Sequence, residues 1–519
     1  MRAAYRVDHI RAAEERLIGR DGDEAVMRRA ATGLAVVCAR LVAATRGRVT
    51  GARVVLLVGS GNNGGDVLWA GAWLAGRGAR VVAVPLATSV HGAGSAALLA
   101  AGGRLLDTGD TSGAEREIRS ADLVVDGIVG IGGTGALRPT AAGVAAAALR
   151  SGALVVACDL PSGVDADSGA VADRDAVVRA DVTVTFGALK PGLLLMPGAE
   201  FVGITHLVDI GLGADLLGVG PPATRVLQAD DVALLLGSPG GDDHKYSRGV
   251  VVVSAGSDDY PGAGVLVAGG ARCGGAGLVQ FCGLRTGEVL SRFPDVVAGE
   301  SAMPRATGAV VGPGLSGTAR DAMESQPLDL LESDLPLVLD ATALRWAAES
   351  NAWAEVVRRR AARGAVTVMT PHDGEFLALG GSADLLRRDR LAAALELATS
   401  WGSVVLLKGA TTVVASPTGH SWVNPVAPPD LAPAGSGDVL AGLVGSWLAA
   451  AEARLASDGR RLSLDAAAEV AAAAVWVHAL AARLAVGDSR QPLAALELME
   501  ALPAAVGVAR SGEYPGGRH

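Results

Sequence analysis

The stretch RVVLLVGSGNNGGD, at residues 53–66, joins a continuous apolar run to a glycine-rich loop. Such a run, ending in glycine, predicts a strand buried in a parallel sheet, with a helix beginning beyond the loop. Similar runs follow, separated at first by alanine-rich helical stretches: RVVAV (80–84), ADLVVDG (121–127), ALVVACD (153–159) and ADVTVTFG (180–187). Strands that alternate with helices predict a doubly wound α/β layer structure for this half of the chain.

The glycine- and proline-rich segment GLGADLLGVGPPAT, at 211–224, is the best candidate for a domain boundary. After it the alternation starts again, with the runs GVVVVSAG (249–256), GAVVGPG (308–314), LPLVLDA (335–341), AVTVMTPH (365–372) and SVVLLKGA (403–410). The sequence therefore predicts an α/β protein with two three-layer αβα domains, at residues 1–220 and 225–510. In such sheets, ligands bind beyond the carboxyl ends of the strands, so we expect the functional residues there.

The composition excludes several function classes. The 519-residue chain has a formal net charge of −9 and 3% aromatic residues, which disfavours binding to nucleic acid or to an anionic membrane. The four cysteines have no CxxC spacing and no associated histidine cluster, so reduced thiols are expected. The charged N-terminal stretch lacks the apolar region of a signal peptide, which predicts a cytoplasmic protein.

Lysine is rare in this chain. Of 45 basic residues only Lys190, Lys245 and Lys408 are lysine. Since lysine is a compact point charge and arginine a wide planar fork, lysine is expected to remain where arginine cannot replace it.

The loop GSGNNGGD, at 59–66, formally matches G-x-G-x-x-G. No acidic residue lies between Val67 and Arg104 to bind a ribose, which disfavours an ordinary NAD-dependent oxidoreductase. The glycines suit backbone contacts to phosphate at a helix N-terminus, and the two asparagines offer carbonyl oxygens for a monovalent cation or for ligand hydroxyls. The alternative is a tight turn between strand and helix.

Two more strand ends carry aspartate, in DGIVGIGGTG (126–135) and DLPSGVDADSG (159–169). Asp126 and Asp159 are expected to face one crevice, although an aspartate at a strand end also commonly caps a turn. In this order, and followed by VTFGALKPG (184–192), the motifs closely resemble the NAD(P)H-hydrate epimerase family, the YjeF N-terminal domain, which has a Rossmann-like fold.

The resemblance implies a site for hydrated NADH or NADPH and a potassium ion. Asp159 would contact the hydrate and act as the acid/base, and Asn63, Asp126 and Ser162 would bind potassium. The remaining hydrate-binding positions would be Asn62, Asn63, Gly64, Gly65, Asp66, Gly130, Ile131, Gly132, Gly133, Thr134, Gly135 and Ala136. Val67 departs from the small residue that the family usually has there, which affects the fine shape of the pocket.

In the second half, PAGSGDVLAG (433–442) places a Gly-Ser-Gly turn before an apolar helix. Free amides there can hold a phosphate, while Asp438 takes a proton from an attacking hydroxyl. A plain helix cap is the alternative for Asp438. Lys408 suits a nucleotide phosphate, or else lies on a surface turn. His244 and His372 are isolated histidines, which are more often hydrogen-bonded structural residues than catalysts, and His478 is interpreted as a packing residue.

These segments, with HKYSRG (244–249), GPGLSG (312–317), LDATAL (339–344) and TPHDGEF (370–376), resemble the ADP- or ATP-dependent NAD(P)H-hydrate dehydratases, which have a ribokinase-like fold. The resemblance implies that Ala263, Gly314, His372 and Asp438 contact the hydrate. It also implies that ADP is bound by Lys408, Gly409, Ala410, Thr411, Thr412, Gly435, Ser436 and Gly437, within a nucleotide loop at 428–437. Thr342 and the segment before the GSGD loop depart from the family pattern.

The joint reading is a bifunctional enzyme that epimerises the R and S hydrates and dehydrates the S form with ADP or ATP, giving AMP and phosphate when ADP is used. Potassium and magnesium are the expected ions. Expected partners are small molecules and further copies of the chain, with no nucleic acid and no membrane. The alternatives are a C-terminal kinase for a sugar or vitamin precursor, and a non-catalytic N-terminal domain that binds a nucleotide or a partner protein.

Overall fold

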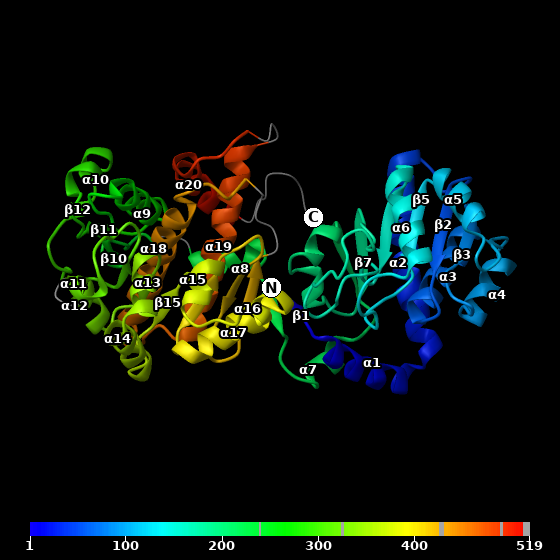
Figure 1. Cartoon of the computed structure of the whole chain (residues 1–519), viewed down its shortest axis with the longest axis horizontal. Helices are drawn as coiled ribbons and strands as arrows, with labels where there is room; N and C mark the ends of the chain where they lie inside the picture. The colour runs from blue at the N-terminus through cyan, green and yellow to red at the C-terminus, as the bar shows by residue number, and fades with distance from the viewer. Residues whose placement is uncertain (238–239, 323–325, 425–429, 488–490, 512–519) are drawn as a thin grey trace. The chain divides into compact units, whose positions relative to one another are not determined.

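The computed structural model describes residues 1–237, 240–322, 326–424, 430–487 and 491–511. The chain forms two compact units: one contains Ala3–Ala223, and the other contains Thr224–His519 together with Met1–Arg2. Figure 1 labels the helices and strands of both units.

The N-terminal unit alternates strands and helices along most of its length. Its strands are β2 (Arg53–Val58), β3 (Arg80–Pro85), β4 (Arg104–Leu105), β5 (Leu123–Gly127), β6 (Leu154–Cys158), β7 (Val182–Phe186) and β8 (Ile204–Val208). Its α-helices are α1 (Val7–Asp21), α2 (Asp23–Arg46), α3 (Asn62–Ala75), α4 (Gly92–Ala100), α5 (Thr111–Arg119), α6 (Pro139–Ser151) and α7 (Gly213–Leu217).

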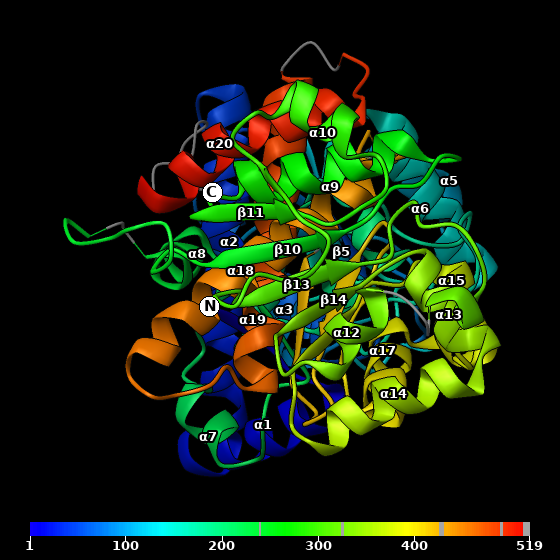
Figure 2. The ribbon, with the colours of Figure 1, turned by 90° about the vertical axis from the view of Figure 1, so that its left-hand side faces the viewer.

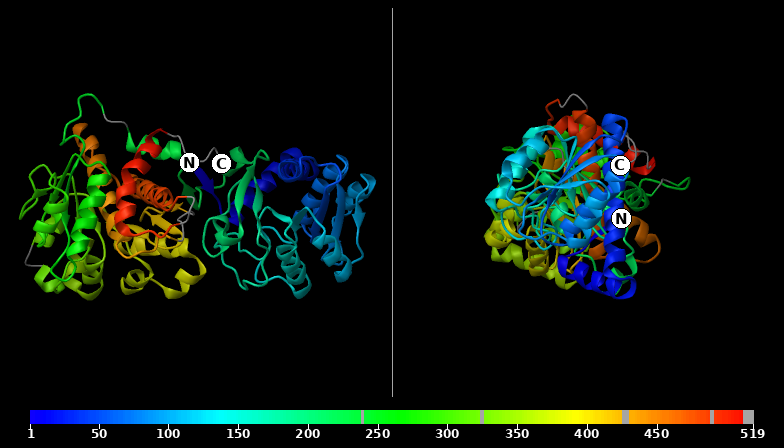
Figure 3. Two further views of the ribbon diagram at one scale, coloured as in Figure 1. Left: turned by 90° about the horizontal axis from the view of Figure 1, so that it is seen from above. Right: turned by 90° about the vertical axis from the view of Figure 1, so that its right-hand side faces the viewer.

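The seven strands form one sheet in the order β4-β3-β2-β5-β6-β7-β8, and every pairing is parallel. Alternate residues of β2 point to opposite faces. Leu56 packs in a core with α2, α3 and α4, whereas Val55 and Leu57 pack in a second core with α5 and α6. The right-hand view in Figure 3 shows these strands between helices on both sides. Burial on both faces explains why the strands are continuous apolar runs.

The order of the strands fixes where a ligand can bind. From β2 the chain goes to β3 on one side, and the later strand β5 pairs with β2 on the other side. The sheet is therefore open between the loops that leave β2 and β5, which is the position where doubly wound sheets bind their ligands. The two glycine-rich motifs at 59–66 and 126–135 are these two loops.

The C-terminal unit is a larger version of the same alternation. Its strands are β9 (Thr224–Val226), β10 (Val250–Ser254), β11 (Leu278–Phe281), β12 (Val297–Ala298), β13 (Gly308–Val311), β14 (Leu337–Leu339), β15 (Thr367–Met369), β16 (Val404–Leu407), β17 (Thr412–Ala415) and β18 (Ser421–Asn424). Its helices are α8 (Ala229–Leu236), α9 (Pro261–Cys273), α10 (Thr286–Arg292), α11 (Ala319–Ala322), α12 (Gln326–Glu332), α13 (Thr342–Glu349), α14 (Asn351–Ala362), α15 (Asp373–Ala378), α16 (Ala383–Arg388), α17 (Arg390–Trp401), α18 (Ser436–Ser457), α19 (Leu464–Val486) and α20 (Ala495–Ser511).

This sheet has the order β1-β9-β18-β17-β16-β15-β14-β13-β10-β11-β12, in which β1 is Arg2–Ala4. The strands from β16 to β12 are parallel, and β17 is antiparallel to both β16 and β18. Figure 2 shows β11, β10, β13 and β14 side by side. The parallel strands bring the segments after β14, β15 and β16 to one edge of the sheet.

The helices α9, α18, α19 and α20 build the main core of this unit. α9 and α18 approach closely because a Cβ on Gly442 would lie 2.2 Å from the carbonyl oxygen of Val267. Two helices, α18 and α19, are long and apolar enough to cross a membrane, but 72% of each apolar window is buried inside the protein. Such burial is typical of the core helices of an α/β unit.

The predicted α/β class with parallel sheets is confirmed, and most of the predicted runs are strands. Several strands were not predicted from the sequence, namely β1, β4, β8, β9, β11, β12, β17 and β18. The strand β8 has the burial pattern of a sheet edge, with Ile204 and Leu207 exposed, so it lacks the continuous apolar signal. The hairpin β17–β18 is antiparallel and its strands have four residues each, which is short for recognition by periodicity.

Candidate active sites

A cavity of about 520 Å³ opens at the switch point of the N-terminal sheet. It is bordered by α1, α2, the loops after β2 and β5, and Asp159 after β6. The predicted hydrate-binding residues that line it are Asn62, Asn63, Asp66, Gly130, Ile131, Gly132 and Asp159.

A second cavity, of about 450 Å³, lies on the other side of the loop that follows β5. It shares Ser60, Ile128, Val129 and Gly130 with the first, and it contains the predicted residues Gly133, Thr134, Gly135 and Ala136. The two cavities therefore border one loop from both sides, which suits an elongated ligand better than a compact one.

Gly64 and Gly65, by contrast, line neither cavity. A Cβ on Gly64 would lie 2.3 Å from the carbonyl oxygen of Gly59, so this glycine allows the loop to turn tightly into α3. Val67 is fully buried, and its methyl groups lie where a Cβ on Gly127 would be. The residue that departs from the family pattern therefore packs behind the loop, away from the cavity.

Asp159 lies at the end of β6 and faces a buried lysine. Its Oδ1 accepts hydrogen bonds from Lys190 Nζ and from Thr185 Oγ1, the latter at 3.1 Å. The Lys190 side chain is 2% exposed, and its Nζ also donates to Thr185 Oγ1 at 2.8 Å. Asp159 has a φ of +67°, in the left-handed region, which aspartate adopts more readily than most residues. The turn holds this carboxylate at the cavity wall.

Further carboxylates surround the same cavity. Burial, reinforced by the charges of Asp159, Glu14 and Asp23, raises the pKa of Asp66 well above its ordinary value. Burial also raises the pKa of Glu14 on α1, while Lys190 and Arg11 oppose the shift. Several carboxyl groups with raised pKa values around one cavity are typical of a site that transfers protons.

The three predicted potassium ligands gather beneath the loop after β5. Asp126 is fully buried, and its Oδ1 accepts a hydrogen bond from Ser162 Oγ at 2.7 Å. Burial raises the pKa of Asp126 to about 6, against the effect of hydrogen bonds from Ser162 and Ile128. Ser162 Oγ also lies 3.1 Å from the carbonyl oxygen of Val129, and Asn63 Nδ2 is buried without a partner within the described ranges. Asp126, Ser162 and Asn63 offer carboxylate, hydroxyl and amide oxygens, which are the ligand atoms that suit a hard monovalent cation, whereas the unpartnered Nδ2 of Asn63 is an N–H donor and could only meet an acceptor.

In the C-terminal unit, Lys408 and Asp340 form the central ion pair. Lys408 follows β16, Asp340 follows β14, and Lys408 Nζ lies 2.8 Å from Asp340 Oδ1 and 3.9 Å from Glu375 Oε2. Burial would lower the pKa of Lys408, but the nearby carboxylates outweigh it and raise that pKa. The residue after Asp340, Ala341, has a φ of +49°. Asp159 and Ala341 are the only two non-glycine residues with positive φ in the described part of the chain, and backbone strain of this kind concentrates at functional sites.

Asp438 lies in the first turn of α18, next to this pair but not bonded to it. Gly435, before the helix, has a φ of +89°, which opens the turn. Burial and the negative charge of Asp340 raise the pKa of Asp438 to about 7, and Lys408 partly opposes the shift. A carboxylate with a pKa near neutrality is suited to accept a proton from a hydroxyl. His478 is buried, and its Nε2 lies 3.0 Å from the carbonyl oxygen of Ser436, so the predicted packing residue also holds this turn.

The remaining residues predicted to bind the hydrate in this unit are Ala263, Gly314 and His372. A Cβ on Gly314 would lie 2.4 Å from Ala263 Cβ, so these two residues meet at the switch point between β10 and β13. His372 caps α15, because its Nδ1 accepts hydrogen bonds from the Gly374 and Glu375 amides, although its side chain is 62% exposed. Thr342 donates to the carbonyl oxygen of Leu315 at 2.9 Å. Thr342, which departs from the family pattern, is therefore held by a hydrogen bond within the protein.

The predicted nucleotide loop at 408–412 is fixed from behind by an arginine. Arg390 donates to the carbonyl oxygens of Lys408 and Thr411, and pairs with Asp373 at 2.8 Å. A Cβ on Gly437 would lie 3.5 Å from Lys408 Nζ, so the GSGD turn and the lysine face each other. Pro428 and Pro429, at the start of the predicted loop, lie outside the described residues.

Two family models match the chain in the same order as these two sites. The model described as YjeF-related protein N-terminus matches residues 23–192, and the one described as NAD(P)H-hydrate dehydratase matches residues 251–504. The chain is 44% identical to the bifunctional NAD(P)H-hydrate repair enzyme Nnr of Mycobacterium leprae, over 94% of this chain and 95% of that protein. The chain belongs to the bifunctional NAD(P)H-hydrate repair enzyme family. The resemblance drawn from the motifs is thereby confirmed for both halves.

A second relative agrees with this membership. The enzyme of the same name from Mycobacterium tuberculosis is 43% identical over 86% of this chain and 89% of its own length. Among solved structures, the ADP/ATP-dependent NAD(P)H-hydrate dehydratase of Bacillus subtilis, co-crystallised with ATP and Mg²⁺, covers 55% of this chain and 99% of its own, with 26% identity and a TM-score of 0.46.

Sequence reasoning missed several residues that contact the predicted ones. Lys190 and Glu14 in the first unit, and Glu375 and Arg390 in the second, were not assigned to a site. The rarity of lysine was the available signal for Lys190, since two of the three lysines are the partners of buried aspartates. Lys245, the third, is exposed and lies 5.1 Å from the Tyr246 ring centroid.

Proposed function

We propose that the chain repairs hydrated NADH and NADPH in two steps, one in each half. Residues 1–220 would interconvert the R and S hydrates, and residues 225–510 would dehydrate the S form with ADP or ATP. The observation that carries this proposal is that a relative named for bifunctional repair aligns with both units, and that each unit holds a buried aspartate–lysine pair at its predicted site.

In the epimerase half, inversion at the hydroxyl-bearing carbon requires a hydroxyl to leave from one face of the ring and water to return on the other. Asp159 is the proposed acid/base, since it reaches the cavity and is held by Lys190 and Thr185. Asn63, Asp126 and Ser162 would hold a potassium ion, which would supply positive charge to this site. The loop at 130–136 would hold the rest of the dinucleotide.

In the dehydratase half, Asp438 would accept the proton of the substrate hydroxyl as its oxygen attacks the terminal phosphorus of the nucleotide. The backbone amides of Gly435 to Gly437 would hold the transferring phosphoryl group, and Lys408 would balance its charge. Phosphate then leaves together with a ring proton and restores the double bond. Phosphate is a much better leaving group than hydroxide, which explains the use of a nucleotide.

Magnesium would accompany the nucleotide. The described residues contain no group of three or more His, Cys, Asp or Glu side chains that could hold a metal ion. Magnesium usually binds to one or two carboxylates and to substrate phosphates, so the nucleotide itself would supply most of its ligands.

The test is to incubate the full chain with a mixture of R and S hydrates and ADP, following the return of absorbance at 340 nm. The proposal predicts complete recovery with ADP, recovery of the S fraction alone when the N-terminal site is disabled, and one phosphate released per NADH formed. Accumulation of a stable phosphorylated product would instead indicate a kinase. The cytoplasmic location and self-association expected above belong to the same proposal.

A further inference from the structure

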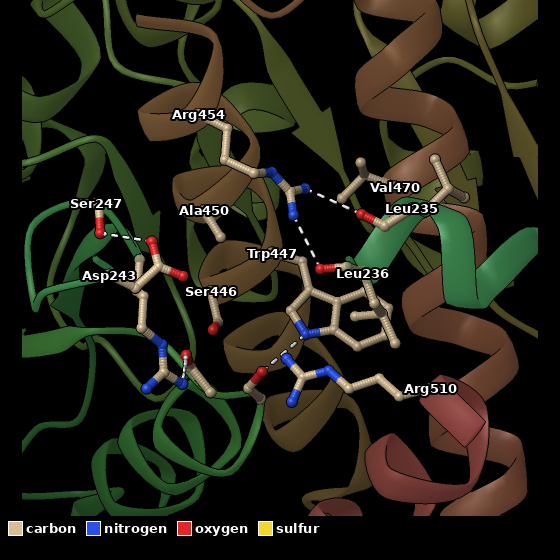
Figure 4. A pocket seen from close by; sticks show the side chains of 13 residues that line it. Leu235, Leu236, Asp243, Ser247, Ser446, Trp447, Ala450, Arg454, Val470 and Arg510 are labelled. Atoms are coloured by element: carbon tan, nitrogen blue, oxygen red, sulfur yellow. Dashed lines mark hydrogen bonds between the residues drawn. The ribbon is translucent and has the colours of Figure 1, made fainter. Parts of the chain in front are cut away.

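A separate cavity of about 90 Å³ lies in the C-terminal unit (Figure 4). It is lined by residues of α8, α18, α19 and α20, of the turn after α9 and of the segment before β10. Ser446, on its wall, lies eight residues after Asp438 in α18, which corresponds to about 12 Å along the helix. The cavity is therefore distinct from the proposed dehydration site.

The cavity is strongly basic in a chain that is acidic overall. Arg248, Arg454 and Arg510 line it, and Asp243 is the one acidic residue among the lining residues that the structure describes. Asp243 is already occupied: its carboxylate accepts hydrogen bonds from Ser247 Oγ at 2.9 Å and from the Gly240 amide at 2.8 Å. The lining thus carries an excess of two positive charges.

Two of the three arginines are fixed by backbone carbonyls. Arg454 donates to the carbonyl oxygens of Leu236 and Leu235 at 2.9 and 3.0 Å, and Arg248 donates to that of Gly275 at 3.0 Å. Burial, together with the charges of Arg248 and Arg454, lowers the pKa of Arg510. With one carboxylate for three arginines in the described lining, the positive charges repel one another, and an anionic ligand would offset this repulsion.

Two buried polar atoms at the cavity have no partner within the described residues: Ser446 Oγ and Arg510 Nε. The Ser446 side chain is 1% exposed, and Figure 4 shows its hydroxyl directed away from the Asp243 carboxylate. Buried donors without partners cost free energy, so such atoms usually have an ion, water or ligand beside them. The volume suffices for a tetrahedral anion.

We propose that this cavity binds the phosphate group of a small anion, with Arg510, Arg248 and Ser446 as donors. Arginine suits phosphate because its planar fork can donate two hydrogen bonds to one oxyanion. The ligand is either free phosphate or a small phosphate monoester whose organic part packs on Trp447, Leu235 and Val470.

The test measures the melting temperature of the full chain as inorganic phosphate is added at constant ionic strength, with ADP and Mg²⁺ in excess to fill the nucleotide site. We expect a saturable rise for the wild type. Ser446→Ala and Arg510→Gln each weaken the apparent phosphate affinity by about tenfold, as expected for loss of a hydrogen bond to a charged group. Arg388→Gln, an exposed arginine elsewhere in the same unit, is the matched control and leaves the affinity unchanged.

Phenyl phosphate distinguishes the two sources of the ligand. Tighter binding than inorganic phosphate assigns the site to a monoester, and equal binding assigns it to the free ion. No saturable rise in the wild type, or an equal rise in Ser446→Ala, would overturn the proposal. Because Ser446→Ala removes one buried oxygen that has no partner, it keeps the test valid if Arg510→Gln fails to fold.

Discussion

The two units place a lysine differently relative to the aspartate proposed to react. In the N-terminal unit, Lys190 bonds directly to Asp159. In the C-terminal unit, Lys408 bonds to Asp340, and Asp438 beside them has no such bond. Each unit has one strained non-glycine residue at this point, Asp159 itself in the first and Ala341 in the second.

The difference shows how one fold class can prepare carboxylates for two tasks. Burial raises the pKa of Asp438 to about 7, the negative charge of Asp340 adds to the shift, and Lys408 opposes it only in part. It can then take up and release a proton near neutral pH. Asp159 instead stays paired with a buried cation, and acts within a cavity where Asp66 and Glu14 have raised pKa values.

The largest expected effect comes from a substitution that stops dehydration in the C-terminal unit and leaves epimerisation in the N-terminal unit unchanged. Asp438→Asn removes the proposed base, so nucleotide-driven recovery of absorbance at 340 nm falls by about 10³-fold. Epimerisation, measured by separating R and S hydrates, stays unchanged. Asp458→Asn, at the other end of the same helix, is the control. Recovery at the wild-type rate in Asp438→Asn would remove Asp438 from the mechanism.

The corresponding change in the N-terminal unit is Asp159→Asn. We expect the R hydrate to be recovered about 10²-fold more slowly, down to the rate of its spontaneous epimerisation, while the S hydrate is recovered normally. The exposed Asp107→Asn serves as the control. Equal slowing of both hydrates would mean that Asp159 acts on the whole protein and not on the epimerase site.

Replacing Lys190 or Lys408 by methionine compares how much each ion pair contributes to the free energy of unfolding. Lys190→Met leaves Asp159 without its buried partner and is expected to lower the free energy of unfolding by about 3 kcal/mol. Lys408→Met costs less, because the Lys408 side chain is 20% exposed and that of Lys190 is 2% exposed. Urea denaturation measures both. Lys190→Arg keeps the charge, and a loss as large as that of Lys190→Met would show that size matters more than charge there.

The pH dependence tests the raised pKa of Asp438. The kcat of dehydration is expected to decrease as the pH is lowered below about 7, because Asp438 then becomes protonated. Asp340→Asn removes a negative charge and should shift this acid limb of the pH profile to lower pH. The folded state binds the Asp438 proton more tightly than the unfolded chain, so stability decreases as pH rises from about 4 through 7. Asp438→Asn should therefore melt at a higher temperature than wild type at pH 8. An acid limb that Asp340→Asn leaves in place would contradict this assignment.

The smallest expected effect concerns the potassium site. Replacing K⁺ by Na⁺ at constant ionic strength should lower the melting temperature of the wild type by a few degrees at most, because binding to the folded state alone stabilises by mass action. Ser162→Ala removes one oxygen and should abolish the difference. If the salt effect persists in that variant, the ion binds elsewhere.

Much of the fold could be predicted because its signals are local. The apolar runs at 53–58 and 121–127 each end in a glycine-rich loop, and burial on both faces makes such strands visible in the sequence. β8 escaped prediction because an edge strand with exposed apolar residues has no such pattern. The GSGD turn was visible because glycine and aspartate open a helix in a recognisable order.

The hydrogen-bond and ion-pair partners of the reacting groups were harder to predict from the sequence. Lys190 is 31 residues from Asp159, and Lys408 is 68 residues from Asp340, so neither pairing has a signal within one motif. That Gly64 and Gly65 bind the hydrate stays a prediction, and the structure adds that a Cβ on Gly64 would lie 2.3 Å from the carbonyl oxygen of Gly59. Motifs indicate where a ligand is held, but not which members of the motif reach it.

The sequence alone determined the two α/β units, their order, the family and the strand ends at which chemistry is expected, because these depend on short-range patterns of apolar residues, glycine and aspartate. Only the tertiary structure decided that Lys190 pairs with Asp159 and that Lys408 pairs with Asp340 and leaves Asp438 at a raised pKa. The physical reason is that electrostatic interactions depend on distance and burial in space, and parallel strands bring together residues that are far apart in the chain.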